Sequence, residues 1–263
     1  MKCIIKITMN SFKEKWIYKS DAIFQFMNIF IFYYVNVCVW QAIFRSGHGK
    51  VTGASVAEMI TYLTVSECIA VIVKTEVISE IDHKIRMGEI AMDLLKPVSL
   101  QLFLFWRSIG NMCFRFITCA VPMFAIANLI WDIEYPPIPV LLVVAVMVCN
   151  GMVIQFLLSF FMGLTGFWYP AVWHLERVLD VVTRLFAGSF IPLWLFPQAL
   201  RSIAEILPFQ YIYYIPISVF IQKTHTSYRN IILLQIVWIF GLYVLCRMIY
   251  RMGRKKLTLQ GGW

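Results

Sequence analysis

The sequence has few charged residues. Only 14% of its 263 residues are Asp, Glu, Lys or Arg, whereas 60% are hydrophobic; a soluble domain carries about 25% charged residues. The apolar stretches are long enough for membrane spans of about 20 helical residues rather than for barrel strands. We therefore expect an all-α, polytopic membrane protein that forms a single transmembrane domain over residues 1–263.

Motifs for catalysis and metal binding are also lacking. The sequence contains no GxxxxGK[ST] phosphate-binding loop and no HExxH or GxSxG motif. Its seven cysteines are scattered, without a CxxC pair or a Cys/His cluster, which is typical of buried free thiols rather than of a metal site. We expect a chain that is not an enzyme and that holds no metal, no cofactor and no ATP of its own.

The net charge of +9 does not indicate nucleic acid binding, because the basic residues lie at the ends of apolar runs and not on a soluble face. The apolar runs predict six spans, at about residues 22–44, 56–73, 108–131, 139–163, 171–195 and 231–250. With the N-terminus inside, fourteen basic residues fall on the inner side and five in the outer loops. This bias predicts a multi-pass protein of a bacterial-type plasma membrane with both termini in the cytoplasm.

Three shorter segments complete the predicted fold. Residues 1–20 mix lysines with apolar residues at helical spacing, which predicts an amphipathic helix in the membrane interface. Residues 80–97 carry both charge signs and end in a proline, which predicts a short cytoplasmic helix between spans two and three. Residues 197–220 are apolar but interrupted by prolines, which predicts a re-entrant segment on the outer face between spans five and six.

The helix predicted at 80–97 has two interpretations. It can be an ordinary solvated loop helix. Alternatively, it can dock on a cytoplasmic partner, with an apolar stripe that enters a groove and charges that set the register. The stripe consists of Ile81, Ile85, Ile90, Leu94 and Leu95.

Charged residues in or near the spans also have two interpretations. Glu67, Arg107 and Arg115 are costly to place in a membrane unless they are paired or face a water-filled cavity. They can form structural ion pairs, such as Glu67 with Arg115, or they can contact substrate or act in gating.

Three stretches carry a family resemblance. "IRMGEIAMDLLKPVSL" (85–100) resembles the signature R-x-G-x-[IL]-x-x-x-L-[LT]-[KR]-P of the type-2 class of ABC transporter permeases. "FAGSFIPLWLFPQALRSIAEILPFQYIYYIP" (186–216) is similar to that family's [SA]-G-x-x-x-P-x-x-x-x-P stretch followed by LPF. The ending "GRKKLTLQGG" (253–262) is also similar to that of the family.

The resemblance implies a function and a set of site residues. It implies a permease that dimerises, docks through a coupling helix on a separate nucleotide-binding subunit holding ATP and Mg²⁺, and exports its substrate. The implied coupling residues are Arg86, Gly88, Glu89, Leu94, Leu95, Lys96 and Pro97. The implied outer-gate residues are Gly188, Pro192, Pro197, Pro208 and Phe209.

Several alternatives stay open at this stage. One six-span set needs a second copy or a related permease for a complete path. The aromatic-rich region around residues 168–214 suits an amphipathic substrate, whether a drug, a peptide, a lipid or a glycan. An ion-gradient-driven secondary transporter and a non-transporting membrane scaffold are the alternative functions, and membrane lipid is a partner in each case.

Overall fold

The secondary structure of the described chain is entirely helical. The computed structural model describes residues 2–17, 19–46, 53–94, 98–131, 133–169, 171–224 and 226–260, except for the side chains of residues 2, 3, 19, 91, 94 and 254–260. The α-helices are α1 (Lys2–Ile17), α2 (Lys19–Arg45), α3 (Val56–Val73), α4 (Val77–Arg86), α5 (Glu89–Leu94), α6 (Leu100–Arg115), α7 (Val121–Ile130), α8 (Ile138–Leu164), α9 (Leu175–Phe186), α10 (Gln198–Ile206), α11 (Tyr214–Phe220) and α12 (Tyr228–Gln260).

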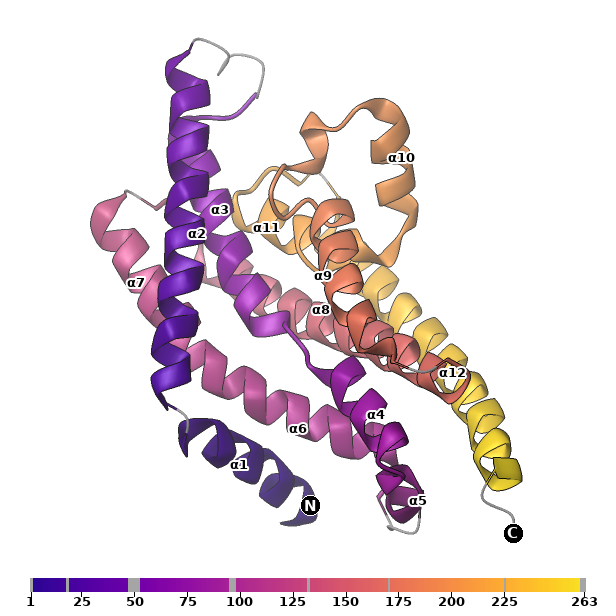
Figure 1. Cartoon of the computed structure of the whole chain (residues 1–263). Coiled ribbons are helices and arrows are strands. Elements are labelled where there is room, and N and C mark those ends of the chain that lie inside the picture. The colour runs from indigo at the N-terminus through magenta and orange to yellow at the C-terminus, as the bar shows by residue number, and fades with distance from the viewer. Residues whose placement is uncertain are drawn as a thin grey trace.

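Short 3₁₀ and π turns join some of these helices. They are the π turn η2 (Phe116–Ala120) and the 3₁₀ turns η3 (Thr165–Phe167), η4 (Val172–His174), η5 (Leu193–Leu195) and η6 (Pro208–Tyr211). In Figure 1, α1 and α5 lie at one end of the bundle and α10 lies near the other. We call these the lower end and the upper end.

Five stretches of the described chain are long and apolar enough to cross a membrane, and two short helices bent by 73° form a sixth candidate. The five are Ser20–Arg45, Val56–Arg86, Leu100–Ile130, Ile138–Phe167 and Tyr228–Gly253. The bent pair, Gln198–Ile206 with Pro208–Phe220, lies where the sequence predicts the re-entrant segment. The all-helical class is confirmed, and the number of spans reaches the predicted six only when the bent pair is counted.

The predicted fifth span, residues 171–195, is not one long helix. Here α9 has only 12 residues, or about 18 Å at 1.5 Å per residue, whereas the hydrocarbon core of a bilayer is roughly 30 Å thick. The helix ends where Gly188 adopts a left-handed φ of 69°, a conformation that glycine accepts without steric cost. The prediction of one long span is therefore wrong, because an apolar run does not reveal this turn.

The predicted N-terminal helix is present as α1, which packs along α6 (Figure 1). Gly110 of α6 permits the close approach, since a Cβ at that position would collide with the carbonyl oxygen of Thr8. Glu14 of α1 then pairs with Arg107 of α6 at 3.2 Å. The packing fixes α1 to the lower half of the bundle.

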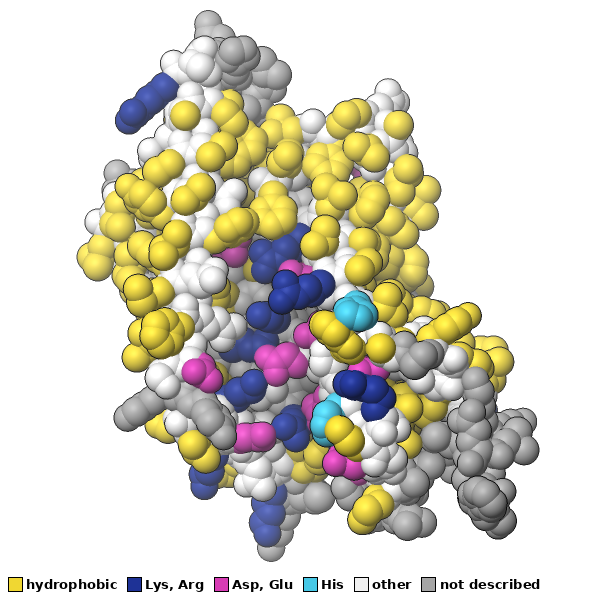
Figure 2. Space-filling model, in the orientation of Figure 1, with side chains coloured by type: hydrophobic (Ala, Val, Ile, Leu, Met, Phe, Trp, Pro, Cys, Tyr) yellow, Lys and Arg dark blue, Asp and Glu magenta, His cyan; other side chains and the backbone are white. Residues whose placement is uncertain are grey.

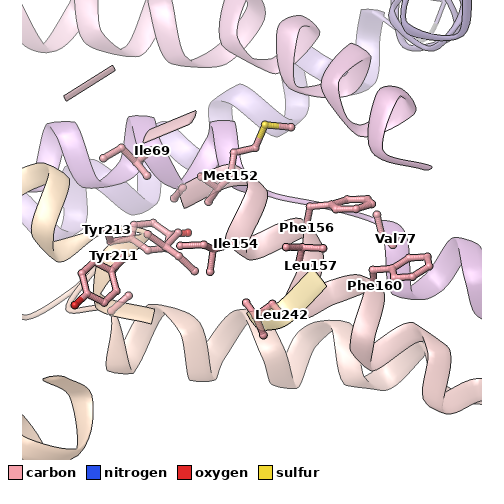
Figure 3. Packing of buried hydrophobic residues seen from close by; sticks show 14 of the residues in the cluster. Ile69, Val77, Met152, Ile154, Phe156, Leu157, Phe160, Tyr211, Tyr213 and Leu242 are labelled. Carbon is pink, nitrogen blue, oxygen red and sulfur yellow. The ribbon is translucent and has the colours of Figure 1, made fainter. Parts of the chain in front are cut away.

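The main hydrophobic core lies between α3, α8 and α12. Figure 3 shows Phe156 and Phe160 of α8 beside Leu242 of α12 and Val77 at the start of α4. Helices α8 and α12 run in the same direction, because the Asn150 amide bonds Gln235 at 3.1 Å and, further down, Phe160 contacts Tyr250. These two helices therefore pack along each other in parallel.

The second predicted span, residues 56–73, coincides with α3, and the chain breaks directly after it, before α4 begins. At the break, Lys74 has an extended backbone with ψ of 129°. Arg115 of the neighbouring span donates a hydrogen bond to the Lys74 carbonyl and pairs with Glu76 at 3.1 Å. Lys15 of α1 pairs with the same carboxylate at 3.0 Å. We call these contacts the Arg115 clamp. They stabilise the non-helical break, after which α4 runs in a different direction from α3 (Figure 1).

Candidate functional site

The segment predicted as one helix over residues 80–97 is a hairpin of two helices, α4 and α5. The turn between them contains Gly88 with a φ of 70°, which a residue with a side chain rarely adopts. Lys84 of α4 and Asp93 of α5 close the hairpin with an ion pair of 2.7 Å. The prediction of a single helix is wrong, because a turn at Met87 and Gly88 interrupts it.

Part of the apolar stripe of this hairpin packs inside the chain itself. Ile81 and Ile90 are buried in the chain's own core, and a Cβ added at Gly163 of α8 would lie 2.8 Å from Cδ1 of Ile81. Ile81 and Ile90 are therefore not free to enter a partner's groove. The side chains of Leu94 and Leu95 lie outside the described part of the chain, and docking of this segment on a partner stays a prediction. Among the described side chains of this segment, the large apolar ones that are exposed are Met87 and Met92, which are 63% and 69% exposed.

The residues that the family resemblance assigns to coupling lie in different surroundings. Arg86 is bound within the chain, since it pairs at 2.9 Å with the buried Asp82, whose other oxygen accepts a 2.9 Å hydrogen bond from the Val172 N–H. Glu89 is exposed at the start of α5. Leu94 is the last residue of α5. The coupling residues Leu95, Lys96 and Pro97 lie outside the described residues.

The charged residues predicted near the spans are all paired within the chain. Glu67 lies 3.8 Å from Arg184 of α9, so its predicted pairing with Arg115 is wrong. Arg115 belongs to the Arg115 clamp. Arg107 pairs with Glu80 at 3.4 Å and with Glu14 of α1 at 3.2 Å. The structural interpretation thus accounts for each of the three, and a role in substrate contact or gating stays a prediction.

Two cavities lie on the face between α2 and α9. Figure 2 shows acidic and basic side chains gathered along the middle of this face, with hydrophobic side chains above and on both sides. The first cavity, of about 410 Å³, is bounded by the α3–α4 break, α8, α9 and Tyr213 at the start of α11. The second, of about 390 Å³, lies between α2, α3 and α9. Lys74 lines both cavities.

The first cavity has an excess of unpaired cations. Both of its acidic residues are engaged: Glu176 accepts a 3.0 Å hydrogen bond from the Ser79 N–H, and Asp180 pairs with Arg184 at 3.3 Å. In contrast, Lys74 and Arg177 are exposed to the cavity and form no ion pair with any other described residue. Two positive charges are thus available to a ligand.

The cavity also offers polar groups from its buried wall. The amide oxygen of Gln155 is buried and accepts no hydrogen bond from the described residues. The hydroxyls of Thr75 and Ser159 bond each other at 2.7 Å, and Tyr213 lines the same wall. The site can therefore bind a group that combines negative charge with hydroxyl donors.

The residues predicted at the outer gate lie together in the chain's upper turns. Gly188 follows α9 and its carbonyl accepts a hydrogen bond from the Tyr62 hydroxyl of α3. Pro192 precedes η5, and Pro197 precedes α10. Pro208 begins η6, and the adjacent ring of Phe209 lies 6.4 Å from that of Phe186. The structure links these turns to α3 and α9, and their gating role stays a prediction.

Sequence reasoning does not single out Lys74, Gln155 or Tyr213 of the first cavity. Lys74 carries a weak signal, a lone base at the end of a long apolar run. Gln155 and Tyr213 carry no such signal, because Gln155 lies in α8 and Tyr213 lies directly before α11, about sixty residues apart in sequence. Only the packing of α8 against η6 and α11 brings them to one wall.

A family model described as ABC-2 family transporter protein matches residues 30–261 of the 263. The chain belongs to the ABC-2 transporter family. This confirms the resemblance seen in the sequence motifs, and it makes the chain a membrane permease subunit of an ABC transporter. Permeases of the ABC-2 family work with an ATPase subunit. No curated protein matches the sequence.

Proposed function

We propose that this ABC-2 permease is the membrane half of an exporter in which two permease chains form the path and each α4–α5 hairpin docks on a separate ATPase. The observation that carries the proposal is the hairpin, which is closed by the Lys84–Asp93 ion pair and presents two exposed methionines at its turn. The ATPase supplies the ATP and Mg²⁺ site, since the permease sequence has no phosphate-binding loop. The lower end and both termini then lie in the cytoplasm of a bacterial-type plasma membrane.

The polar face between α2 and α9 supports a path built from two chains. Exposed charge at the depth of the spans is costly against lipid, and this face carries both cavities and a band of charged side chains (Figure 2). A second permease chain that covers the face would enclose a polar route. The partner is either a second copy or a related permease.

Affinity purification of the tagged full chain from its native membranes, in a mild detergent, tests this proposal. We expect an ATPase with a phosphate-binding loop to co-purify and to hydrolyse ATP, and mass spectrometry then identifies the second permease. If the chain purifies without any ATPase, the exporter proposal fails. An ion-gradient-driven transporter or a scaffold would then be the better explanation, and ligand binding near Glu67 would be the next measurement.

The first cavity favours an amphipathic anion as the substrate. Lys74 and Arg177 can neutralise an acidic headgroup, and Gln155 can accept a hydrogen bond from its hydroxyl groups. Exposed apolar residues of α9, such as Val178 and Val181, can hold the hydrophobic part. Among the substrate types that suit the sequence, an acidic lipid or lipid-linked glycan fits this cavity better than a cationic drug.

The double variant Lys74→Gln/Arg177→Gln is expected to weaken this selectivity. Hydrogen bonds to charged groups contribute at least about 1.5 kcal/mol each, so each lost cation should raise the half-maximal concentration of an anionic amphiphile about tenfold. The measurement is stimulation of ATP hydrolysis in the purified complex by taurocholate, compared with the cation tetraphenylphosphonium. Arg45→Gln, at an exposed base of the upper end, is the matched control. Unchanged stimulation by taurocholate in the double variant would rule out this substrate assignment.

A further inference from the structure

Apart from the two cavities between α2 and α9, a groove lies in the lower half of the bundle, between α6, α8 and α12. It has a volume of about 550 Å³. Phe156 and Leu157 of α8 are buried and form its floor, while Phe105 of α6 and Ile239 of α12 form apolar walls. Leu102 at its edge is 52% exposed. In a membrane-spanning bundle such a surface faces acyl chains.

The lower mouth of the groove is strongly basic. Arg247 and Arg251 of α12 line it and are both exposed. Arg247 donates a 2.9 Å hydrogen bond to the Tyr243 hydroxyl, and neither arginine forms an ion pair with another described residue. The sequences of α6, α8 and α12 contain no Asp or Glu at all. The two arginines at this mouth therefore have no acidic side chain on α6, α8 or α12 to neutralise their charge.

The distribution of polar groups gives the groove a direction. The polar residues Ser99 and Gln101 lie at the start of α6, on the same lower side as the two arginines. The upper part, at Val153 and Ile239, is apolar. A ligand that fits this arrangement has a negative head at the lower mouth and a hydrocarbon tail that points toward the middle of the membrane.

We propose that this groove is a selective site for an anionic phospholipid of the lower leaflet, with its phosphate at Arg247 and Arg251 and one acyl chain over Phe156. The site is independent of the proposed export function, because it uses none of the residues of the α4–α5 hairpin or of the cavities between α2 and α9. A zwitterionic phospholipid fits the apolar part equally well and also has a phosphate, but its quaternary ammonium group cancels that charge and places a third cation beside the two arginines, so its net attraction to this mouth is weaker.

Native mass spectrometry of the full chain tests the proposal. The purified, delipidated protein is offered equal amounts of phosphatidylglycerol and phosphatidylcholine with identical acyl chains. We expect the wild type to retain phosphatidylglycerol preferentially, and Arg247→Gln/Arg251→Gln to lose that preference. One basic residue near an anionic membrane surface contributes about a fivefold change in binding, so the double variant should lose on the order of twentyfold. The control Arg229→Gln changes an exposed base at the upper end of the same helix and should retain the preference.

A second variant tests the apolar part of the groove without changing charge. Leu102→Trp should fill the groove and reduce retention of both lipids, whereas Leu233→Trp, at a leucine that is also 52% exposed on α12, should reduce neither. The proposal is overturned if the wild type retains the two lipids equally, or if the arginine double variant keeps the wild-type preference. Because no ATPase enters this assay, its failure leaves the exporter proposal untouched.

Discussion

The double variant Met87→Glu/Met92→Glu is expected to release the ATPase from the permease. Among the described side chains of the α4–α5 hairpin, the two methionines are the large apolar ones that are exposed, and flexible methionines are well suited to fill a pocket on a partner. A few buried side chains carry most of the energy of an interface, about 2 kcal/mol or more each. Placing two carboxylates there should lower the affinity by at least two orders of magnitude, or about 3 kcal/mol.

This loss is measured by the ratio of ATPase to permease after affinity purification. Both methionines are exposed, so the variant should keep the thermal unfolding midpoint of the wild type. Met252→Glu, at a methionine that is 58% exposed on α12, is the matched control and should keep its ATPase. Charge reversal at Glu89 is a cleaner additional test than reversal at Arg86, because Arg86 also holds the buried Asp82. A double variant with the full complement of ATPase would show that the docking surface lies elsewhere.

Glu76→Ala is expected to destabilise the fold more than any other single change in the Arg115 clamp. The side chain of Arg115 is only 4% exposed, whereas that of Glu76 is 44% exposed. Removing the carboxylate leaves a buried guanidinium with no acid, which costs about 3 kcal/mol or more. Removing the arginine instead leaves a carboxylate that reaches water and is still paired with Lys15 at 3.0 Å.

The comparison with Arg115→Met makes the prediction specific. Methionine fills the buried volume without charge, so this variant should cost about 1 kcal/mol, and Glu76→Ala/Arg115→Met should be more stable than Glu76→Ala alone. Thermal unfolding of the full chain in detergent gives the order of the three midpoints. If Arg115→Met unfolds at a lower temperature than Glu76→Ala, the clamp does not stabilise the break in the way described.

The membrane class and the positions of most helices follow from the sequence because they depend on local composition. Long apolar runs are enough to locate α2, α3, α8 and α12, and the prolines after residue 190 are enough to exclude a straight helix there. The resemblance to ABC-2 permeases likewise depends on short motifs, such as Gly88 with its neighbours, that can be read directly. These features need no knowledge of which helices become neighbours.

The errors concern features that depend on three-dimensional neighbours. The partner of Glu67 is Arg184 and not Arg115, since the order of the helices in space decides which charges meet. The apolar stripe at Ile81 and Ile90 faces the chain's own core for the same reason. The hairpin and the short α9 depend on Gly88 and Gly188 in left-handed conformations, which a hydrophobic pattern does not register. The sequence also cannot show that Lys74 and Arg177 are available to a ligand, because this depends on the neighbouring acids Glu176 and Asp180 being bound to other groups.

The packing of α4 has a mechanical consequence. Its Ile81 packs closely against Gly163, where an added Cβ would lie 2.8 Å from Cδ1 of Ile81. Its Ser79 N–H donates a hydrogen bond to Glu176 of α9, and its Asp82 accepts one from the Val172 N–H of η4. Toward α3, by contrast, α4 is joined through a short extended segment at residues 74–76. The side-chain contacts of α4 therefore run to α8 and to the segment that leads into α9, whereas its link to α3 is the chain itself and the Arg115 clamp. If the hairpin docks on an ATPase as proposed, its displacement should move α8 and α9 before it moves α3.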